Sequence, residues 1–195
     1  MHRVRLPGLL LALAHLASAC APAANLRPMT PMLPDHAAEV GVGYTQVGPR
    51  PVGQDDTVHG GQAWVTSQPL TWLDISLVGA FAAQGVAVAG LAVRWRALEV
   101  DGFAAGIGAE LGSGWAAIDL PLAVRVVDGL WAYSAPQLGT WGKDATVRLP
   151  LGLDVELFDE LRIRGEAQMN YPRRDGEFDG YQRRLHLGMG MAFRL

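Results

Sequence analysis

Acidic and basic side chains alternate with apolar ones in several stretches near the end of the chain. The residues of interest are Asp154, Glu156, Arg162, Arg164, Glu166, Arg184 and His186. Alternation with a period of two predicts β-strands that have one charged and one apolar face. Carboxylates and guanidinium groups on such a face can neutralise one another in salt bridges, or they can line a pore that selects charged solutes.

The spacing of these charges predicts particular salt bridges. A tight turn at 157–160 separates Glu156 from Arg162, so these two residues are expected nearly opposite one another on neighbouring strands. Cross-strand neighbours on one face lie ~4.5–5.5 Å apart at Cβ, which is within reach of a salt bridge. We therefore predict that Arg162 and Arg164 pair with Glu156 and Asp154.

Motifs for catalysis and metal binding are weak. Asp55, Asp56 and His59 lie together in a stretch rich in proline and glycine, which favours a solvated loop at 48–60. No Gly-x-Ser-x-Gly elbow is present, and the glycine-rich stretch at 102–108 lies inside an alternating segment with no helix after it. The single cysteine belongs to no Cys/His constellation. We predict no catalytic residue, no metal site and no cofactor.

The elements that position the charges follow from ten alternating segments after residue 36. They span approximately 37–47, 61–69, 73–82, 86–98, 103–112, 116–127, 130–138, 145–156, 161–170 and 185–195. Long polar loops are expected after the first, seventh and ninth segments, and tight turns after the even ones. Asp-Gly pairs at 101–102 and 128–129 are hairpin signals. An even number of strands with this alternation of loop lengths is typical of a transmembrane barrel.

Glycines indicate which face of the strands points inward. The charged face also carries many small residues, namely Gly41, Gly43, Gly90, Ala92, Gly106, Gly108, Gly152, Gly188, Gly190 and Ala192. Glycine weakens a strand, so a solvated face has no reason to collect it, whereas a narrow lumen shared with long arginines does. We predict an all-β fold: a closed antiparallel up-and-down transmembrane barrel of about ten strands, with eight as the alternative, charges inward and the apolar face toward lipid.

Further charges and the aromatic residues follow from this arrangement. The other charges expected inside are Glu39, Asp74, Arg94, Arg96, Glu110, Asp119, Arg125, Arg148 and Arg194. The aromatic residues near strand ends are expected at the two membrane interfaces. They are Tyr44, Trp64, Trp72, Trp95, Phe103, Trp115, Trp131, Tyr133, Trp141, Tyr171, Tyr181 and Phe193.

The N-terminal stretch MHRVRLPGLLLALAHLASAC has the layout of an export signal, with a basic start, an apolar middle and small residues at its end. Its last residue, Cys20, resembles the acylated cysteine of the bacterial lipobox. That resemblance implies a lipoprotein, and cleavage by an ordinary signal peptidase is the alternative. We predict a signal peptide over 1–19, a Pro-rich periplasmic tether over 20–36 and a barrel over 37–195.

The alternating pattern over 37–195 resembles the small outer-membrane β-barrel superfamily of Gram-negative bacteria, the class of OmpA-type and OmpW-type barrels. The final strand, LHLGMGMAFRL, is similar to the C-terminal assembly signal of these proteins. The resemblance implies location in the bacterial outer membrane. It also implies outer-membrane lipid and the outer-membrane assembly machinery as partners. It implies no substrate and no specific ligand.

Composition and charge argue against one class of partner. The net charge is −3 and no basic patch carries interleaved aromatics, so nucleic acid is not an expected partner. We expect a non-enzymatic barrel, structural or displaying its loops, with a salt-bridged narrow lumen. One alternative is a passive conduit for small or hydrophobic solutes, and another is a periplasmic lipocalin-like ligand-binding lipoprotein.

Overall fold

The computed structural model describes Arg27 and residues 38–47, 58–82, 87–141, 144–174, 177–178 and 184–195. The strands are β1 (Ala38–Val47), β2 (Val58–Leu70), β3 (Leu73–Ala82), β4 (Ala87–Val100), β5 (Phe103–Gly112), β6 (Trp115–Asp119), β7 (Leu122–Val127), β8 (Leu130–Ser134), β9 (Gln137–Trp141), β10 (Asp144–Glu156), β11 (Leu161–Arg174), β12 (Glu177–Phe178) and β13 (Arg184–Arg194). In this part of the chain, no helix is long and apolar enough to cross a membrane.

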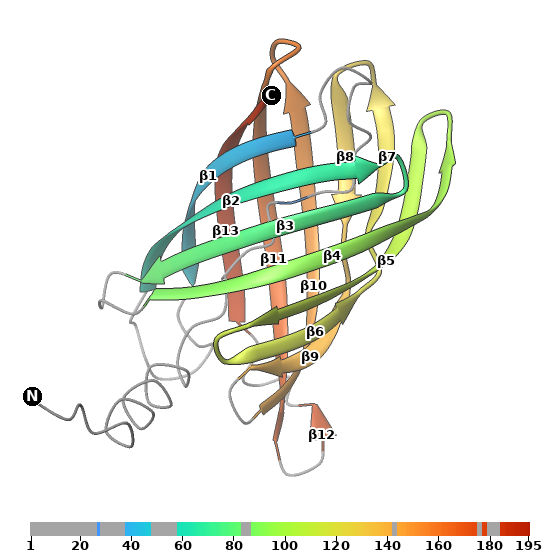
Figure 1. Ribbon diagram of the computed structural model, residues 1–195. Helices are drawn as coiled ribbons and strands as arrows, with labels where there is room; N and C mark the ends of the chain where they lie inside the picture. Colours follow the sequence, from blue (N-terminus) through green and yellow to red (C-terminus); the bar gives the residue numbers. More distant parts are fainter. Residues whose placement is uncertain are drawn as a thin grey trace, which may run out of the picture.

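The strands close into an antiparallel barrel of ten strands, as the alternation predicts. Sequential strands pair as neighbours around the wall, and β13 returns to pair with β1 from Glu39–Arg194 to Val47–His186. β6 and β7 together occupy one position in the wall, and β8 and β9 occupy the next. The small β12 pairs only with the far end of β11, beyond the body of the barrel (Figure 1). Closure leaves the ten strands of the wall without a free edge.

Prolines explain why two of the predicted strands are each broken in two. Pro121 separates β6 from β7, and Pro136 separates β8 from β9. Proline has no N–H to donate to a ladder and is therefore found at breaks and bulges. The break is bridged by the N–H of Leu120, which donates to the carbonyl of Pro136 at 3.0 Å. Opposite the break, β10 changes partner from β9 to β8 around Pro150.

Three loop predictions need correction. The loop expected after residue 170 starts later, because β11 continues to Arg174, and it contains β12. The sequence assigns 48–60 to a loop, but β2 already begins at Val58, so His59 lies on a strand. The link after the seventh predicted strand is not long, because β9 reaches Trp141 and β10 begins at Asp144. The sequence places the Asp-Gly hairpin turns correctly.

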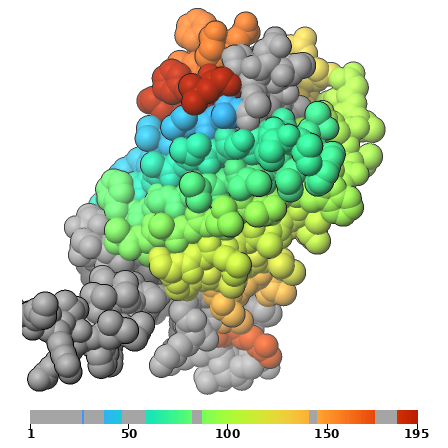
Figure 2. Space-filling view, in the orientation of Figure 1, coloured from blue at the N-terminus to red at the C-terminus, as the bar shows by residue number. Residues whose placement is uncertain are grey.

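The two faces of the wall differ as predicted. Large apolar side chains cover the outside on every side of the barrel, and Leu77, Leu111 and Leu151 are 63%, 65% and 68% exposed. Figure 2 shows the outer side chains of successive strands packed next to one another over one face of the barrel. The inside holds the buried charges, together with a few buried aromatic residues and alanines. Burial is therefore inverted relative to a soluble protein, with charges inside and apolar residues outside.

Candidate functional site

Ion pairs between β10 and β11 form the first cluster in the lumen. The Arg162 guanidinium contacts the Asp154 carboxylate and donates from Nη2 to Glu156 Oε2 at 2.7 Å. Arg164 donates from Nε to Asp154 Oδ1 at 3.3 Å. Arg194 of β13 reaches Glu156 at 3.5 Å. The structure thus brings together the four residues for which the turn at 157–160 predicts pairing.

Strand register explains this cluster. Asp154 lies directly opposite Arg164, and Glu156 lies opposite Arg162. The short turn fixes this register, because Leu157 N–H donates to the Leu161 carbonyl at 2.9 Å. Residues two apart on a strand share a face, so all four side chains enter the lumen together.

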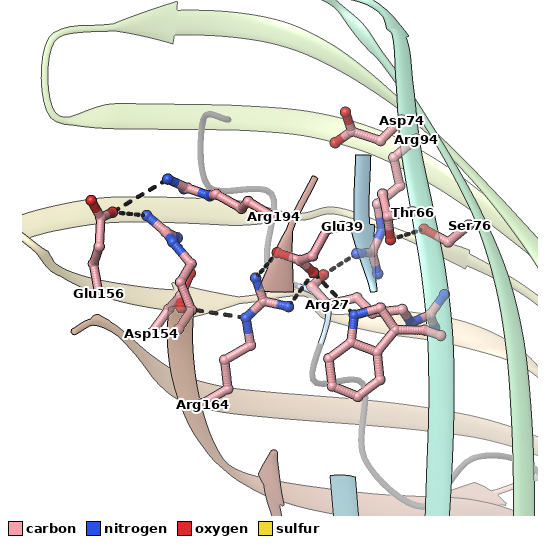
Figure 3. A network of polar contacts seen from close by, with 12 residues as sticks. Arg27, Glu39, Thr66, Asp74, Ser76, Arg94, Asp154, Glu156, Arg164 and Arg194 are labelled. Carbon is pink, nitrogen blue, oxygen red and sulfur yellow. Dashed lines mark hydrogen bonds and ion pairs between the residues drawn. The ribbon is translucent and has the colours of Figure 1, made fainter. Parts of the chain in front are cut away.

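Arg164 also links β11 to β1, which lie on either side of β13 where the barrel closes. It donates from Nη1 to Glu39 Oε1 at 2.6 Å and holds the second carboxylate oxygen through Nη2 (Figure 3). Glu39 lies on β1, and Arg164 reaches it across β13, where its register partner is Gly190. Trp64 Nε1 donates to the same carboxylate at 3.0 Å, and the Arg164 guanidinium lies 5.8 Å from the centre of the Trp64 ring. Both charges are almost fully buried.

A second cluster surrounds Arg94 on β4. Its Nε donates to Asp119 Oδ2 at 2.8 Å, and its Nη2 lies 3.5 Å from Glu110 Oε1. Arg27 donates from Nη2 to Glu110 Oε1 at 2.7 Å and is itself buried. On the same strand, Arg96 lies 3.5 Å from Asp74. The segment that contains Arg27 was predicted to be a periplasmic tether, but Arg27, the only part of it that the structure describes, lies inside the barrel.

The remaining predicted site residues are dispersed. Glu166 accepts a hydrogen bond from the Tyr133 hydroxyl at 3.0 Å, and His186 lies 2.9 Å from the Asn170 amide nitrogen. Arg184 begins β13, and its side chain lies outside the described residues, as does Cys20. Arg125 was predicted to lie inside but is at the rim, where it pairs with Asp101 in the exposed turn between β4 and β5.

Four aromatic residues predicted at the membrane interfaces lie in the lumen instead. They are Trp64, Trp115, Trp131 and Tyr133. Three of these rings cover glycines of the wall, because a Cβ added to Gly41 would lie 2.1 Å from Trp64 Cζ2 and one added to Gly152 would lie 2.3 Å from Tyr133 Cζ. The Trp115 ring covers Gly90 and Gly112 in the same way. The inward glycines therefore make room for aromatic rings as well as for arginines.

The acids and arginines of the lumen neutralise one another. The described residues of the lumen form no metal site. No group of three or more His, Cys, Asp and Glu side chains converges in the described part of the chain. Asp55 and Asp56 lie outside the described residues, whereas the exposed His59 stacks on Tyr44 with ring centroids 5.9 Å apart. The chemistry that these contacts support is ion pairing between acids and guanidinium groups.

Comparison with known proteins gives information about the fold. No protein-family model matches the chain, and no curated protein matches it at a significant level. Among solved structures, the NanC porin aligns with a TM-score of 0.53 at 10% identity, over 82% of this chain and 100% of its own. The KdgM porin aligns with a TM-score of 0.46 at 13% identity, over 80% of this chain and 99% of its own. The likeness to the NanC porin shows a shared β-barrel fold.

Proposed function

We propose that this chain is a non-enzymatic β-barrel of the bacterial outer membrane whose lumen is closed by its own salt bridges. In this proposal the barrel faces lipid with its apolar side and serves as a structural or loop-displaying protein. The inverted burial carries the proposal. Leu151 is 68% exposed, whereas Asp154, three residues further along the same strand, is fully buried.

The apolar outer face and the closed backbone pairing both favour a lipid environment. A soluble monomer rarely exposes apolar patches larger than a few hundred Å², yet here apolar side chains cover the outside of every full-length strand. Backbone groups in lipid need internal partners, which a closed barrel supplies. A lipocalin-like barrel would hold its apolar face inside to bind a ligand, and the buried Arg162, Arg164 and Asp154 disfavour that alternative.

The contents of the lumen favour a closed barrel over a conduit. Side chains can fill the interior of a barrel of ~8 strands, whereas open channels belong to barrels of ~16–18 strands, and ten strands lie much nearer the lower number. Here Trp64, Trp115 and Tyr133 enter the lumen together with the ion pairs, and all three are buried. The passive conduit is thus the second candidate function. A measurement of ion conductance distinguishes the closed barrel from the conduit.

The far end of β11 supports a role in display. β11 continues to Arg174 and turns into β12, whereas the pairing of β11 with β13 stops at Asn170 (Figure 1). The hairpin of β11 and β12 therefore extends past β13 at one end of the barrel, whereas β10 stays paired with β11 as far as Pro172. In small barrels of the outer membrane, the longer loops are the extracellular ones.

Planar-bilayer recording of the purified full-length chain tests the proposal. Folding is verified first by a heat-dependent mobility shift on gels. A folded barrel is expected to insert without stable conductance steps. Reproducible steps from the folded wild-type protein would contradict the closed lumen and favour the conduit.

A further inference from the structure

Arg27 occupies a binding site in the lumen. Its Nη2 donates to Glu110 Oε1 on β5 at 2.7 Å, and its backbone carbonyl accepts from Nη1 of Arg94 on β4. Figure 3 shows Arg27 among the residues of the lumen network, with the contact to Arg94 drawn. Side chain and main chain are therefore both engaged by the wall, although Arg27 lies 83 residues away from Glu110 in the sequence.

The wall is built from small residues at this position. The register partners of Glu110 are Ala92 on β4 and Ala117 on β6. On β5, Gly108 and Gly112 are the next residues on the same face, on either side of Glu110. Elsewhere the wall carries large inward side chains such as Trp64 and Tyr133. Trp115 covers Gly112, and Asp119 and Arg94 fill the space over Gly108. The short side chains of Ala92 and Ala117 beside Glu110 are therefore the ones that leave its carboxylate within reach of Arg27.

Charge balance fits a guanidinium group at this site. The acids of the wall that point inward are Glu39, Asp74, Glu110, Asp119, Asp154, Glu156 and Glu166. The arginines of the wall that point inward are Arg94, Arg96, Arg148, Arg162, Arg164 and Arg194. Among the described residues this makes seven acids against six arginines, a net charge of 6 − 7 = −1. Arg27 brings the balance to zero.

We propose that Glu110, with the small residues beside it, forms a guanidinium-binding site in the lumen, and that Arg27 fills this site in cis as a removable plug. This inference rests on the proposed closed barrel. Glu110 is the anchor because it also receives Gln137 Nε2 at 3.4 Å, which orients its carboxylate. When Arg27 leaves, the site is left with excess negative charge and favours a cationic occupant that has the planar shape of a guanidinium group.

Removal of either partner is expected to open the lumen. The time-averaged conductance of Arg27→Ala and of Glu110→Gln in planar bilayers should rise at least ~10-fold over wild type, which corresponds to ~1.4 kcal/mol in plug occupancy. The Arg27→Ala current should favour cations. Arg125→Ala is the matched control, because it removes an arginine that pairs at the rim with Asp101. The heat-dependent mobility shift verifies folding, and Glu110→Gln decides if Arg27→Ala does not fold.

Block by an added cation tests the chemistry of the site. Millimolar guanidinium chloride should reduce the Arg27→Ala current, and the same concentration of tetramethylammonium chloride should not. If wild type, Arg27→Ala and Glu110→Gln are all folded and silent, Arg27 is not the plug, although the closed barrel stands. If wild type conducts as well as Arg27→Ala, the closed barrel itself fails. Equal block by both cations would refute the guanidinium site.

Discussion

Replacement of Arg164 by methionine should destabilise the barrel by ~3–5 kcal/mol, the loss expected when one partner of a buried ion pair is removed. Arg164 holds both carboxylate oxygens of Glu39 and one oxygen of Asp154, and its side chain is 2% exposed. At ~4 Å and an effective dielectric constant of ~20, one such pair is worth ~4 kcal/mol. Trp64 still donates to Glu39 after the change, so the lower half of the range is expected.

A double variant separates the pair from its surroundings. Arg164→Met combined with Glu39→Leu removes both charges and should recover much of the loss, since apolar replacements of buried ion pairs are often neutral or stabilising. Urea unfolding in phospholipid vesicles, followed by tryptophan fluorescence, measures each variant. Arg125→Met at the rim is the control and should cost at most ~1 kcal/mol. Additive losses below ~1 kcal/mol for Arg164→Met and Glu39→Leu would show a hydrated lumen and refute the reasoning.

Three more predictions concern the two faces of the barrel wall and the N-terminal export signal. Leu151→Arg places a charge on the apolar face in mid-strand and should cost ~2–4 kcal/mol by the same unfolding assay. Gly165→Ala on that face should be tolerated, because a Cβ added at Gly165 meets no atom within 4 Å. Equal effects would contradict the assigned faces. Gly152→Ser should lower stability by ~1–3 kcal/mol, because its Cβ would lie 2.3 Å from Tyr133 Cζ. An unchanged unfolding midpoint would contradict this. Cys20→Ser should abolish palmitate labelling if the lipobox resemblance holds, and unchanged processing would point to ordinary signal peptidase.

Strand positions and faces were accessible from the sequence because alternation with a period of two is a local signal. The ten segments follow from it, and so do the inward charges other than Arg125, which lies at the rim. The turn at 157–160 was enough to pair Glu156 with Arg162. The strand breaks at Pro121 and Pro136 were missed because the apolar alternation continues through them. The prolines themselves were the available signal.

The inward aromatics had a signal that the sequence reasoning overlooked. Trp64 shares its parity with the polar Gln62 and Thr66, which places it on the inward face, and Gly41 lies opposite it in register. Position near a strand end was the weaker argument for this residue. Arg27 had no such signal, since its surroundings show no periodicity and its partner Glu110 lies far away in sequence.

The neighbours Ser76 and Leu77 on β3 test the central claim, that the apolar face meets lipid and the charged face a closed interior. Ser76 is 5% exposed and Leu77 is 63% exposed. Each is replaced by cysteine in a Cys20→Ser background, and the protein is folded into lipid vesicles. Leu77→Cys, labelled with a spin probe, should be accessible to oxygen and protected from a water-soluble nickel chelate, and Ser76→Cys should resist a polar maleimide. A nickel-accessible probe at Leu77, or rapid labelling at Ser76, would contradict the account.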